Sequence, residues 1–208
     1  MARPVSASSS CVRTISASEA GLSADGRHRW WLTRRWGDGE RSLLFIGLNP
    51  SRADGIRDDP TLRRLIGFGR AWGYDALLVV NLFARMSPSP AALLRSRDPI
   101  GSRCDAELLR WTRHWAVTAD WDLWCGWGNG GRRAQRDIQV AELLQPLVAE
   151  RARRVPHHAG PLALGLTGSH QPRHPLYAPR TLQLEPFSWA GIGAIRHPEK
   201  TLTAVRPR

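Results

Sequence analysis

Polar side chains that can form specific hydrogen bonds follow the apolar runs of this chain. Asn49-Pro50-Ser51 follows one run, Asn81 follows the next, and residues 126–131 (GWGNGG) and 167–177 (TGSHQPRHPLY) follow two more. A carboxamide carries both a donor and an acceptor, so it can orient a water molecule or read the edge of a nucleobase. Each stretch also has a structural explanation, because Asn-Pro, Gly-rich and His-Pro segments are common in turns.

Three of these residues have side chains suited to particular steps of a reaction. Asn49 could orient a water molecule, because Pro50 fixes the next stretch of backbone and removes a competing N–H. Asn81 could read a base edge through two hydrogen bonds. His174 could donate an N–H to developing negative charge or act as a general acid. The alternative for His174 is a loop histidine that caps a carbonyl.

An acidic cluster lies before the segment that begins at Pro60. Asp54, Asp58 and Asp59 could hold Mg²⁺ or share a proton. Acidic residues are also preferred at a helix N-terminus, and we favour that explanation. Arg63 and Arg64, one turn into the same helix, could pair with these acids or contact phosphate, and the sequence does not separate the two.

The glycines of residues 126–131 suggest a second kind of contact. They could let a phosphate approach the backbone at the start of the following helix. The run lacks the GxxxxGK[ST] pattern of a P-loop, which argues against an NTPase.

Alternating apolar runs and amphipathic stretches must position these residues. The apolar runs cover residues 43–48, 76–80, 121–125 and 161–166. Helical spacing of apolar residues marks a helix over 60–73, one through Leu108, Trp111 and Trp115, and one over 132–148. Continuous apolar strands are typical of parallel sheets buried on both faces. We therefore predict a three-layer α/β/α sandwich with a four-stranded parallel central sheet and a ligand crevice beyond the carboxyl ends of its strands.

The composition of the chain divides it into three parts. Residues 1–25 are rich in serine and alanine and predict a disordered leader. Residues 26–180 predict one α/β domain, and residues 181–208 an irregular basic C-terminal tail. The run RWWLTRRW, residues 29–36, predicts an edge strand; its Trp30 and Trp31 are expected to cover the core, with base stacking as the alternative.

The charge of the chain favours an acidic partner. Its 30 basic and 18 acidic residues give a formal net charge of +12. A strongly basic protein is typical of those that bind nucleic acid. Because Lys200 is the only lysine, an arginine-favouring genome would also produce part of this charge. We expect a nucleic acid, DNA in the first place, or a nucleotide as partner.

Cysteine usage and hydropathy predict where the protein works. Cys11, Cys104 and Cys125 are odd in number and far apart, so they predict neither a disulfide framework nor a structural metal site. The N-terminus has no apolar run of signal-peptide length, and no stretch approaches the length of a membrane span. The expectation is a cytoplasmic protein without membrane contact, metal or cofactor.

Four segments, in order between Trp30 and Tyr177, resemble an uncharacterised family of bacterial and phage proteins, domain of unknown function 1643. They are LLFIGLNPSRAD, DDPTLRRLIGFGRAWGYDALLVVNLFA, CGWGNGG and PRHPLY. That family implies no activity.

A second similarity is to the uracil-DNA glycosylase superfamily, whose members are α/β/α sandwiches on a four-stranded parallel sheet. GLNPS is similar to their Gly-hydrophobic-Asn-Pro-Gly motif through Asn49 and Pro50, with Ser51 in place of the last glycine. LLVVNLF resembles their base-reading element through Asn81. The stretch 174–176 (HPL) is similar to their His-Pro loop, which carries an apolar wedge for the duplex.

This resemblance implies a mechanism for the site. A base is extruded into the crevice, Asn81 reads it, Asn49 orients water toward the sugar C1′, and His174 or its backbone stabilises the leaving base. Leu176 or Tyr177 would fill the gap in the base stack.

The chain departs from the superfamily pattern at several points. Arg173 before the histidine and Tyr177 after it differ from the usual loop, and no aspartate stands in the water-activating position. The leading expectation is a DNA-directed, glycosylase-like hydrolase. The alternatives are a non-catalytic module that binds nucleic acid or a nucleotide in the same pocket, and a small-molecule enzyme that uses the aspartates with a metal.

Overall fold

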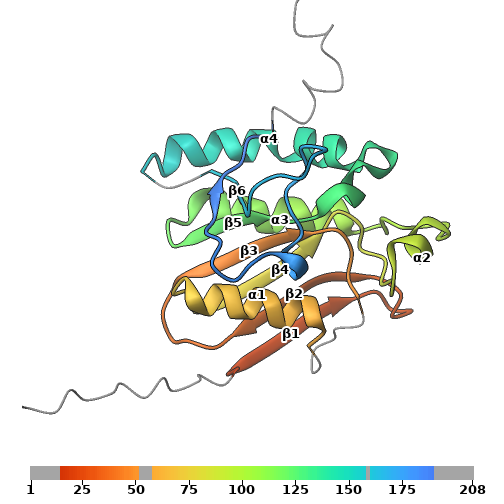
Figure 1. Cartoon of the computed structure of the whole chain (residues 1–208), viewed down its shortest axis with the longest axis horizontal. Coiled ribbons are helices and arrows are strands. Elements are labelled where there is room, and N and C mark those ends of the chain that lie inside the picture. Colours follow the sequence, from red (N-terminus) through yellow and green to blue (C-terminus); the bar gives the residue numbers. More distant parts are fainter. Residues whose placement is uncertain (1–14, 52–57, 158–159, 190–208) are drawn as a thin grey trace, which may run out of the picture.

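A mixed seven-stranded sheet with helices on both faces forms the body of the protein (Figure 1). The computed structural model describes residues 15–51, 58–157 and 160–189. Its strands are β1 (Ala17–Leu22), β2 (Arg29–Arg35), β3 (Ser42–Gly47), β4 (Ala76–Asn81), β5 (Trp121–Cys125), β6 (Leu162–Ala163) and β7 (Glu185–Pro186). Its helices are α1 (Pro60–Ala71), α2 (Pro90–Leu94), α3 (Cys104–Val117) and α4 (Arg136–Arg154), with 3₁₀ turns η1 (Gly128–Gln135) and η2 (Pro175–Tyr177).

The strand order of the sheet is β1-β2-β4-β3-β5-β6-β7. β3 pairs in parallel with β4 and β5, and β5 pairs in parallel with β6. β2 is antiparallel to β4, β1 to β2, and β7 to β6. The prediction of a four-stranded parallel sheet is therefore wrong for the sheet as a whole, because antiparallel strands extend both of its edges.

One strand differs from the prediction in its position in the sheet, and another differs in its length. β2 was expected at the edge, but it lies between β1 and β4 and is largely buried. Of the run expected over 161–166, only Leu162 and Ala163 belong to the sheet, whereas Leu166 forms an isolated antiparallel bridge with Pro172. Gly165 has a φ of 77°, and this left-handed conformation turns the chain away from the sheet.

The strand β1 lies within the predicted disordered leader. Its residues pair with β2 from Ala17 opposite Arg35 to Leu22 opposite Arg29. Strand pairing uses backbone N–H and C=O groups, so a segment without large apolar side chains can still add an edge strand. Residues 1–14 of the predicted leader lie outside the described residues.

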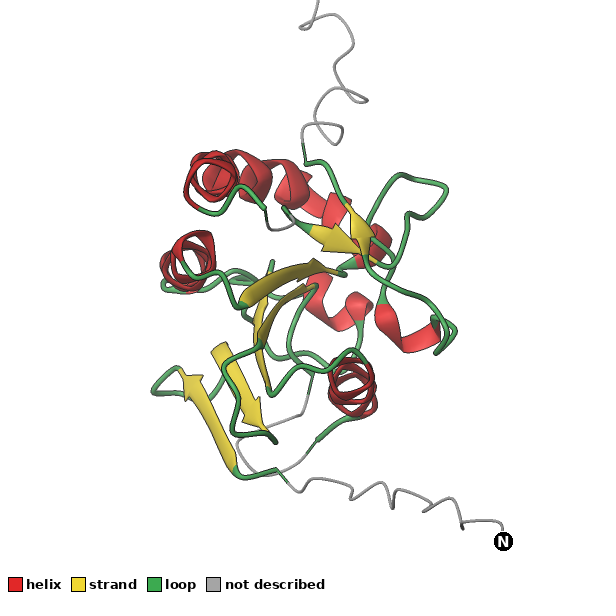
Figure 2. Ribbon diagram, turned by 90° about the vertical axis from the view of Figure 1, so that its left-hand side faces the viewer, coloured by secondary structure: helices red, strands yellow, loops and turns green. Residues whose placement is uncertain are grey.

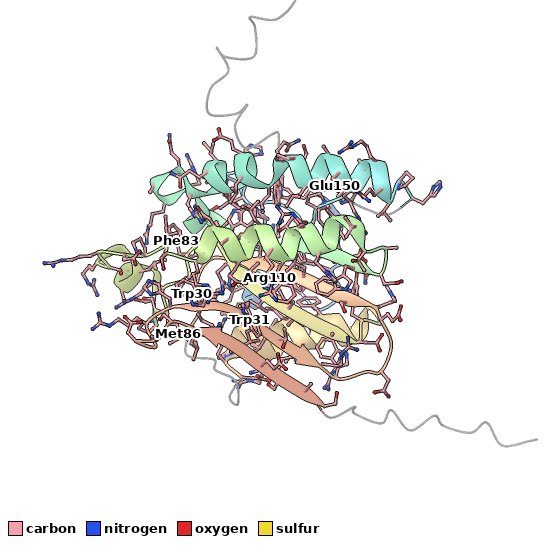
Figure 3. All side chains as sticks on the ribbon, turned by 180° about the vertical axis from the view of Figure 1, so that it is seen from behind. Trp30, Trp31, Phe83, Met86, Arg110 and Glu150 are labelled. Carbon is pink, nitrogen blue, oxygen red and sulfur yellow. The ribbon has the colours of Figure 1, made fainter. Side chains whose placement is uncertain are left out.

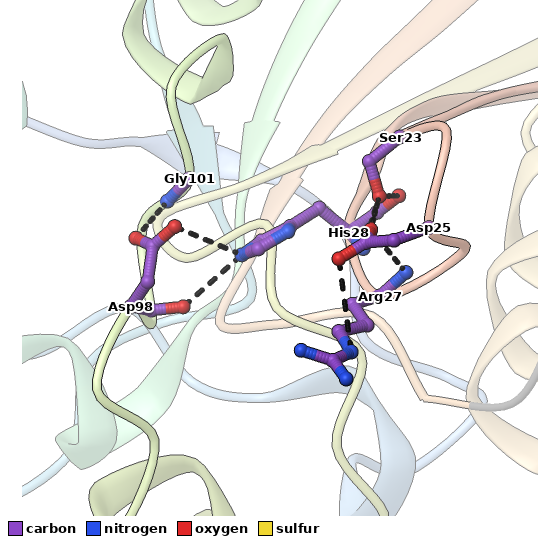
Figure 4. A network of polar contacts seen from close by, with 6 residues as sticks. All are labelled: Ser23, Asp25, Arg27, His28, Asp98 and Gly101. Atoms are coloured by element: carbon purple, nitrogen blue, oxygen red, sulfur yellow. Dashed lines mark hydrogen bonds and ion pairs between the residues drawn. The ribbon is translucent and has the colours of Figure 1, made fainter.

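A polar network closes the turn between β1 and β2 (Figure 4). The Ser23 hydroxyl donates to Asp25 at 2.6 Å, and the Arg27 backbone N–H donates to the same carboxylate at 3.0 Å. His28 lies 3.0 Å from the backbone oxygen of Asp98 through its Nε2. This contact joins the turn to the loop that leads into α3.

Figure 2 shows helices on both sides of the central strands, and alternate residues of these strands pack against the two helical layers. Leu44 and Ile46 of β3 face the core formed with α3 and α4, whereas Leu43 and Phe45 face the core formed with α1. Successive side chains of a strand point to opposite faces, so a continuous apolar run buries both faces. The helices therefore form layers above and below the sheet.

The helix after β5 begins later than its sequence pattern predicts. Ala134 and Gln135 have φ values of 49° and 54°, so the chain passes through η1 before α4 starts at Arg136. An α-helix cannot continue through two left-handed residues. α4 then extends to Arg154.

The tryptophans of β2 cover the core. Trp30 is 6% exposed and stacks on His28, with ring centroids 5.3 Å apart. Trp31 meets Trp111 of α3 edge to face, and both β2 tryptophans lie beside α3 in Figure 3. These contacts favour the core role over base stacking.

The predicted C-terminal tail begins with ordered structure. After β7, Phe187 and Trp189 are buried and pack edge to face against Trp127. Residues 190–208 of the predicted tail lie outside the described residues. Across the described part of the chain, no helix combines the length and apolar character needed to cross a membrane.

Candidate functional site

A small cavity lies at the carboxyl ends of β3 and β4. It holds about 50 Å³, room for only a few water molecules. Four elements line it: the start of β2, the end of β3 with the segment after it, the end of β4, and the first turns of α1, with His174 from the loop before η2. The lining residues are Arg29, Phe45, Gly47, Leu48, Asn49, Ser51, Asp59, Thr61, Leu62, Leu65, Val79, Asn81 and His174.

The topology of the sheet places a cavity here. The chain leaves β3 for α1 on one face, whereas it leaves the neighbouring strands β4 and β5 for α3 and α4 on the other face. Connections that diverge to opposite faces leave a crevice at the carboxyl ends of the strands, where open α/β sheets bind ligands. Asn49, Ser51, Asn81 and His174 all line this crevice.

Asn81 has a buried donor that no described residue satisfies. The residue is 5% exposed, and its Nδ2 has no hydrogen-bond partner among the residues that the structure describes. Gly47 lies opposite Asn81 in the parallel register. A Cβ on Gly47 would lie 2.8 Å from the Asn81 Oδ1, so the glycine provides the space that the amide occupies.

The Asn49 amide is held in one orientation. Its Nδ2 donates to the backbone oxygens of Pro50 at 2.9 Å and Ser87 at 3.2 Å. Two carbonyl acceptors identify the nitrogen end of the amide, so the Oδ1 is turned the other way, as an acceptor. An acceptor fixed in this manner is suited to orient a water molecule.

His174 is a neutral hydrogen-bond donor. Its Nδ1 accepts the backbone N–H of Leu176 at 3.2 Å and caps the η2 turn. Burial lowers the pKa of His174 below the ordinary 6.5, although the negative charge of Asp59 opposes the shift. The neutral ring therefore carries its proton on Nε2 at neutral pH.

Asp59 caps the N-terminus of α1. Its Oδ1 accepts the backbone N–H of Leu62 at 2.7 Å, which makes Asp59 the N-cap, and its Oδ2 accepts a hydrogen bond from the Ser51 hydroxyl. Each carboxylate oxygen therefore already accepts one hydrogen bond that holds the start of α1 in place. The helix-start explanation is confirmed for this residue.

The other acidic residues do not form a metal site among the described residues. Asp58 pairs with the buried Arg34 at 2.9 Å. No group of three or more potential ligands occurs in the part of the chain that the structure describes. Asp54 lies outside the described residues. Arg63 donates to the Asp58 backbone oxygen and Arg64 to that of Ala178, so both arginines have backbone partners.

The glycine-rich run is explained by close packing. A Cβ on Gly126 would lie 2.6 Å from Phe45, and one on Gly130 would lie 2.5 Å from Leu48. The run enters η1 rather than the first turn of α4. The glycines therefore end before α4 begins at Arg136, and the contact of this run with a phosphate stays a prediction.

The four other residues predicted to contact a substrate are not among the residues that line the cavity. Pro50 is buried and supplies the carbonyl that holds Asn49. Leu176 is half-buried, whereas Tyr177 is 89% exposed. Arg173 is exposed and donates to the Leu166 backbone oxygen at 3.4 Å.

Arg29 is a cavity residue that the sequence reasoning missed. It is 4% exposed and begins β2, next to the end of β4. In the sequence it is one charged residue of a predicted strand. Only the antiparallel pairing of β2 with β4 brings it to the carboxyl ends of the parallel strands.

The comparison with family models gives one match. The model described as "Protein of unknown function (DUF1643)" matches residues 29–176, more than two thirds of the chain. The match covers every described residue that lines the cavity. No curated protein and no solved structure matches the chain. The similarity to the uracil-DNA glycosylase superfamily stays a prediction.

Proposed function

This chain belongs to the DUF1643 family, whose description states no activity, and we propose that it hydrolyses the N-glycosidic bond of a nucleic-acid base held in the cavity at the ends of β3 and β4. DNA is the expected substrate.

The observation that carries this proposal is the unsatisfied amide of Asn81. Leaving a buried donor without an acceptor costs roughly 1–3 kcal/mol. The donor lines a cavity, so a ligand with an acceptor atom would complete its hydrogen bond. A base with a ring carbonyl offers such an acceptor.

The neighbouring groups supply the remaining steps of a hydrolysis. The Asn49 Oδ1 accepts a hydrogen bond from a water molecule and directs its oxygen toward C1′ of the sugar. The C1′–N bond breaks, and its electron pair leaves with the base. The Nε2–H of His174 stabilises the negative charge on the departing base, and the proton of the attacking water passes to the base or to solvent.

The size of the cavity implies that a base enters only when the lining side chains move apart. About 50 Å³ is too small for a nucleobase. Among the described lining residues, His174 alone belongs neither to the strands and α1 nor to the segment that joins them. We expect the His174 loop to move when a base binds.

One observation favours a second candidate, a module that binds a nucleotide or nucleic acid without cleaving it. Asp59 is the single carboxylate among the described lining residues, and both of its oxygens are engaged. A carboxylate whose oxygens both serve structural hydrogen bonds is less suited to take a proton from water. Binding without turnover would leave the roles of Asn81 and His174 unchanged.

The test is incubation of the protein with labelled oligonucleotides that carry uracil, hypoxanthine, thymine mismatches or unmodified bases, followed by alkali to cut abasic sites. The variants are Asn49→Ala and Asn81→Ala. Gln139→Ala is the control, because Gln139 is an exposed carboxamide of α4, on the face of the sheet opposite to α1, and does not line the cavity.

The hydrolase proposal expects cleavage by the wild type and the control, and loss of cleavage in both cavity variants. Retained binding by Asn49→Ala would show that water positioning, not base recognition, was removed. Salt-dependent binding without cleavage in the wild type supports the binding module instead. If the wild type neither cleaves nor binds any of these oligonucleotides, both functions are wrong.

A further inference from the structure

A wide groove runs along the outer side of α1, apart from the cavity. It holds about 540 Å³. Figure 1 shows η2 and the segment that follows it next to this helix. The described residues that line the groove are Pro60, Arg63, Arg64, Gly67, Phe68, Ala71 and Arg180.

The groove is positively charged. Three of its described lining residues are arginines, and none of them is acidic. Arg63 and Arg180 are exposed, so their guanidinium groups reach solvent. Arg64 lies over the Phe68 ring, with its Cζ 5.0 Å from the ring centroid. Arginine binds phosphate through paired N–H donors, so the lining is suited to a polyanion.

Gly67 leaves the floor of the groove open. It lies inside α1, where a glycine destabilises a helix by about 1 kcal/mol relative to alanine. A Cβ on Gly67 would meet no atom within 4 Å, so internal packing does not require the glycine. The space that a side chain would occupy belongs to the groove.

The groove and the cavity share α1. Thr61, Leu62 and Leu65 line the cavity, whereas Pro60, Arg63 and Arg64 line the groove. Neighbouring positions in the first turns of one helix therefore line both sites.

The segment after η2 joins the two sites. Arg64 donates to the Ala178 backbone oxygen, which ties α1 to this segment. The exposed Tyr177 lies in the chain between His174 of the cavity and Arg180 of the groove.

We propose that the groove binds the phosphodiester backbone of a single nucleic-acid strand. Charge complementarity selects this occupant, and the exposed Tyr177 offers a face on which a base can stack. That the same strand delivers its base to the cavity rests on the proposed function. Binding of the backbone itself does not.

The experiment measures binding of a short, fluorescent, single-stranded DNA of mixed sequence and unmodified bases over a series of salt concentrations. The groove variant is Arg63→Gln with Arg180→Gln; Arg64 is kept because it ties α1 to residue 178. The matched control is Arg113→Gln with Arg153→Gln, which removes two exposed charges from α3 and α4 on the other face of the sheet. A third variant, Gly67→Gln, fills the groove without changing the charge.

The proposal expects the groove variant to bind about tenfold more weakly at low salt, with the slope of log Kd against log salt reduced by about 2. The control keeps the wild-type slope. Gly67→Gln weakens binding although its thermal stability is unchanged or higher. Equal losses in the groove variant and the control, or full binding by Gly67→Gln, would overturn the proposal. So would displacement of the DNA by polyglutamate at equal charge concentration.

The outcome is separate from that of the cavity experiment. The probe carries no modified base, so Asn81→Ala is expected to keep the wild-type affinity and slope. If the groove variant reduces the slope of log Kd against log salt but no assay detects base release, the groove proposal is supported and the hydrolase proposal is contradicted. Base release at the wild-type rate in the variant that lacks Arg63 and Arg180 supports the hydrolase and contradicts the groove.

Discussion

The side-chain amide of Asn81 lowers the stability of the fold unless a ligand atom accepts the hydrogen bond of its Nδ2. The Nδ2 is buried beside the cavity without an acceptor among the described residues. Groups of this kind are uncommon in folded proteins, where most buried donors are paired. At the residue scale, an apolar substitution of Asn81 should therefore remove ligand binding without lowering the stability of the fold.

We expect Asn81→Leu to be as stable as the wild type or up to about 1 kcal/mol more stable, because it removes an unsatisfied donor at similar side-chain volume. Urea denaturation measures the change. Asn81→Asp, which buries a charge instead, should lose several kcal/mol. Binding and release of a base should be lost in both variants. A destabilised Asn81→Leu protein would mean that the amide is paired within the fold.

The lowered pKa of His174 predicts a pH dependence of stability. The unfolded chain takes up a proton near pH 6.5, whereas the partly buried ring in the folded protein resists protonation to lower pH. The unfolded state then binds more protons, so the free energy of unfolding falls as the pH drops below about 6.5 and is fully restored above it.

His174→Asn isolates this contribution. Asparagine can still accept the Leu176 N–H and cap η2, but it does not titrate. Urea curves at a series of pH values should show a smaller loss of stability for the variant between about pH 7 and pH 5 than for the wild type. Parallel losses in the two proteins would contradict a lowered pKa.

At the scale of secondary-structure elements, Arg151 of α4 connects this helix to α3 and β5. The guanidinium lies beneath the C-terminus of α3, where helix carbonyls lack partners. It donates to the backbone oxygens of Trp115 at 2.8 Å, Thr118 at 2.6 Å and Trp121 at 2.9 Å. One side chain of α4 therefore fixes the end of α3 against the start of β5.

Arg151→Met should lower the free energy of unfolding by about 3 kcal/mol, because several buried carbonyls lose their donor. Arg151→Lys should recover part of the loss, since an ammonium group cannot reach all of the carbonyls. The control is Arg154→Met on the same helix, which removes only an exposed pair with Glu150 and should change stability by less than about 1 kcal/mol. Equal effects of the two methionine substitutions in urea would contradict this role.

The edge strand β1 contributes at the scale of the whole molecule. It pairs along its full length with β2, the strand that carries Arg29 to the cavity and buries Trp30. Without β1, β2 would become an exposed edge that presents unpaired N–H and C=O groups.

Deletion of residues 1–25 should therefore lower the thermal midpoint by several degrees and promote association between copies of the protein. Deletion of residues 1–14 is the matched control, because it leaves β1 and its turn in place. Thermal unfolding and light scattering measure both effects. If the longer deletion behaves like the shorter one, β1 does not contribute to the stability of the sheet.

Much of the central fold could be predicted from the sequence. The runs LLFIGL, ALLVV and WDLWC are short, continuous and apolar, and they alternate with amphipathic helical stretches, which is the pattern of parallel strands buried on both faces. The polar residues after two of these runs, Asn49 and Asn81, therefore had to meet at one edge of the sheet. The helix start at Pro60 was also local, because the residues that cap it are neighbours in the chain.

Contacts between distant segments were decided by the tertiary structure alone. The Asn49 amide donates to the backbone oxygen of Ser87, which lies 38 positions further along the chain. The pairing of β2 with β4 brings Arg29 to the cavity. The strand β1 has few large apolar side chains, so its pairing left no hydrophobic pattern to detect. Local patterns report what a segment buries, whereas hydrogen-bond partners and protonation depend on what the fold places beside it. For that reason the sequence determined the central strands and the position of the crevice, and the tertiary structure decided which of its polar groups are engaged and which are left for a ligand.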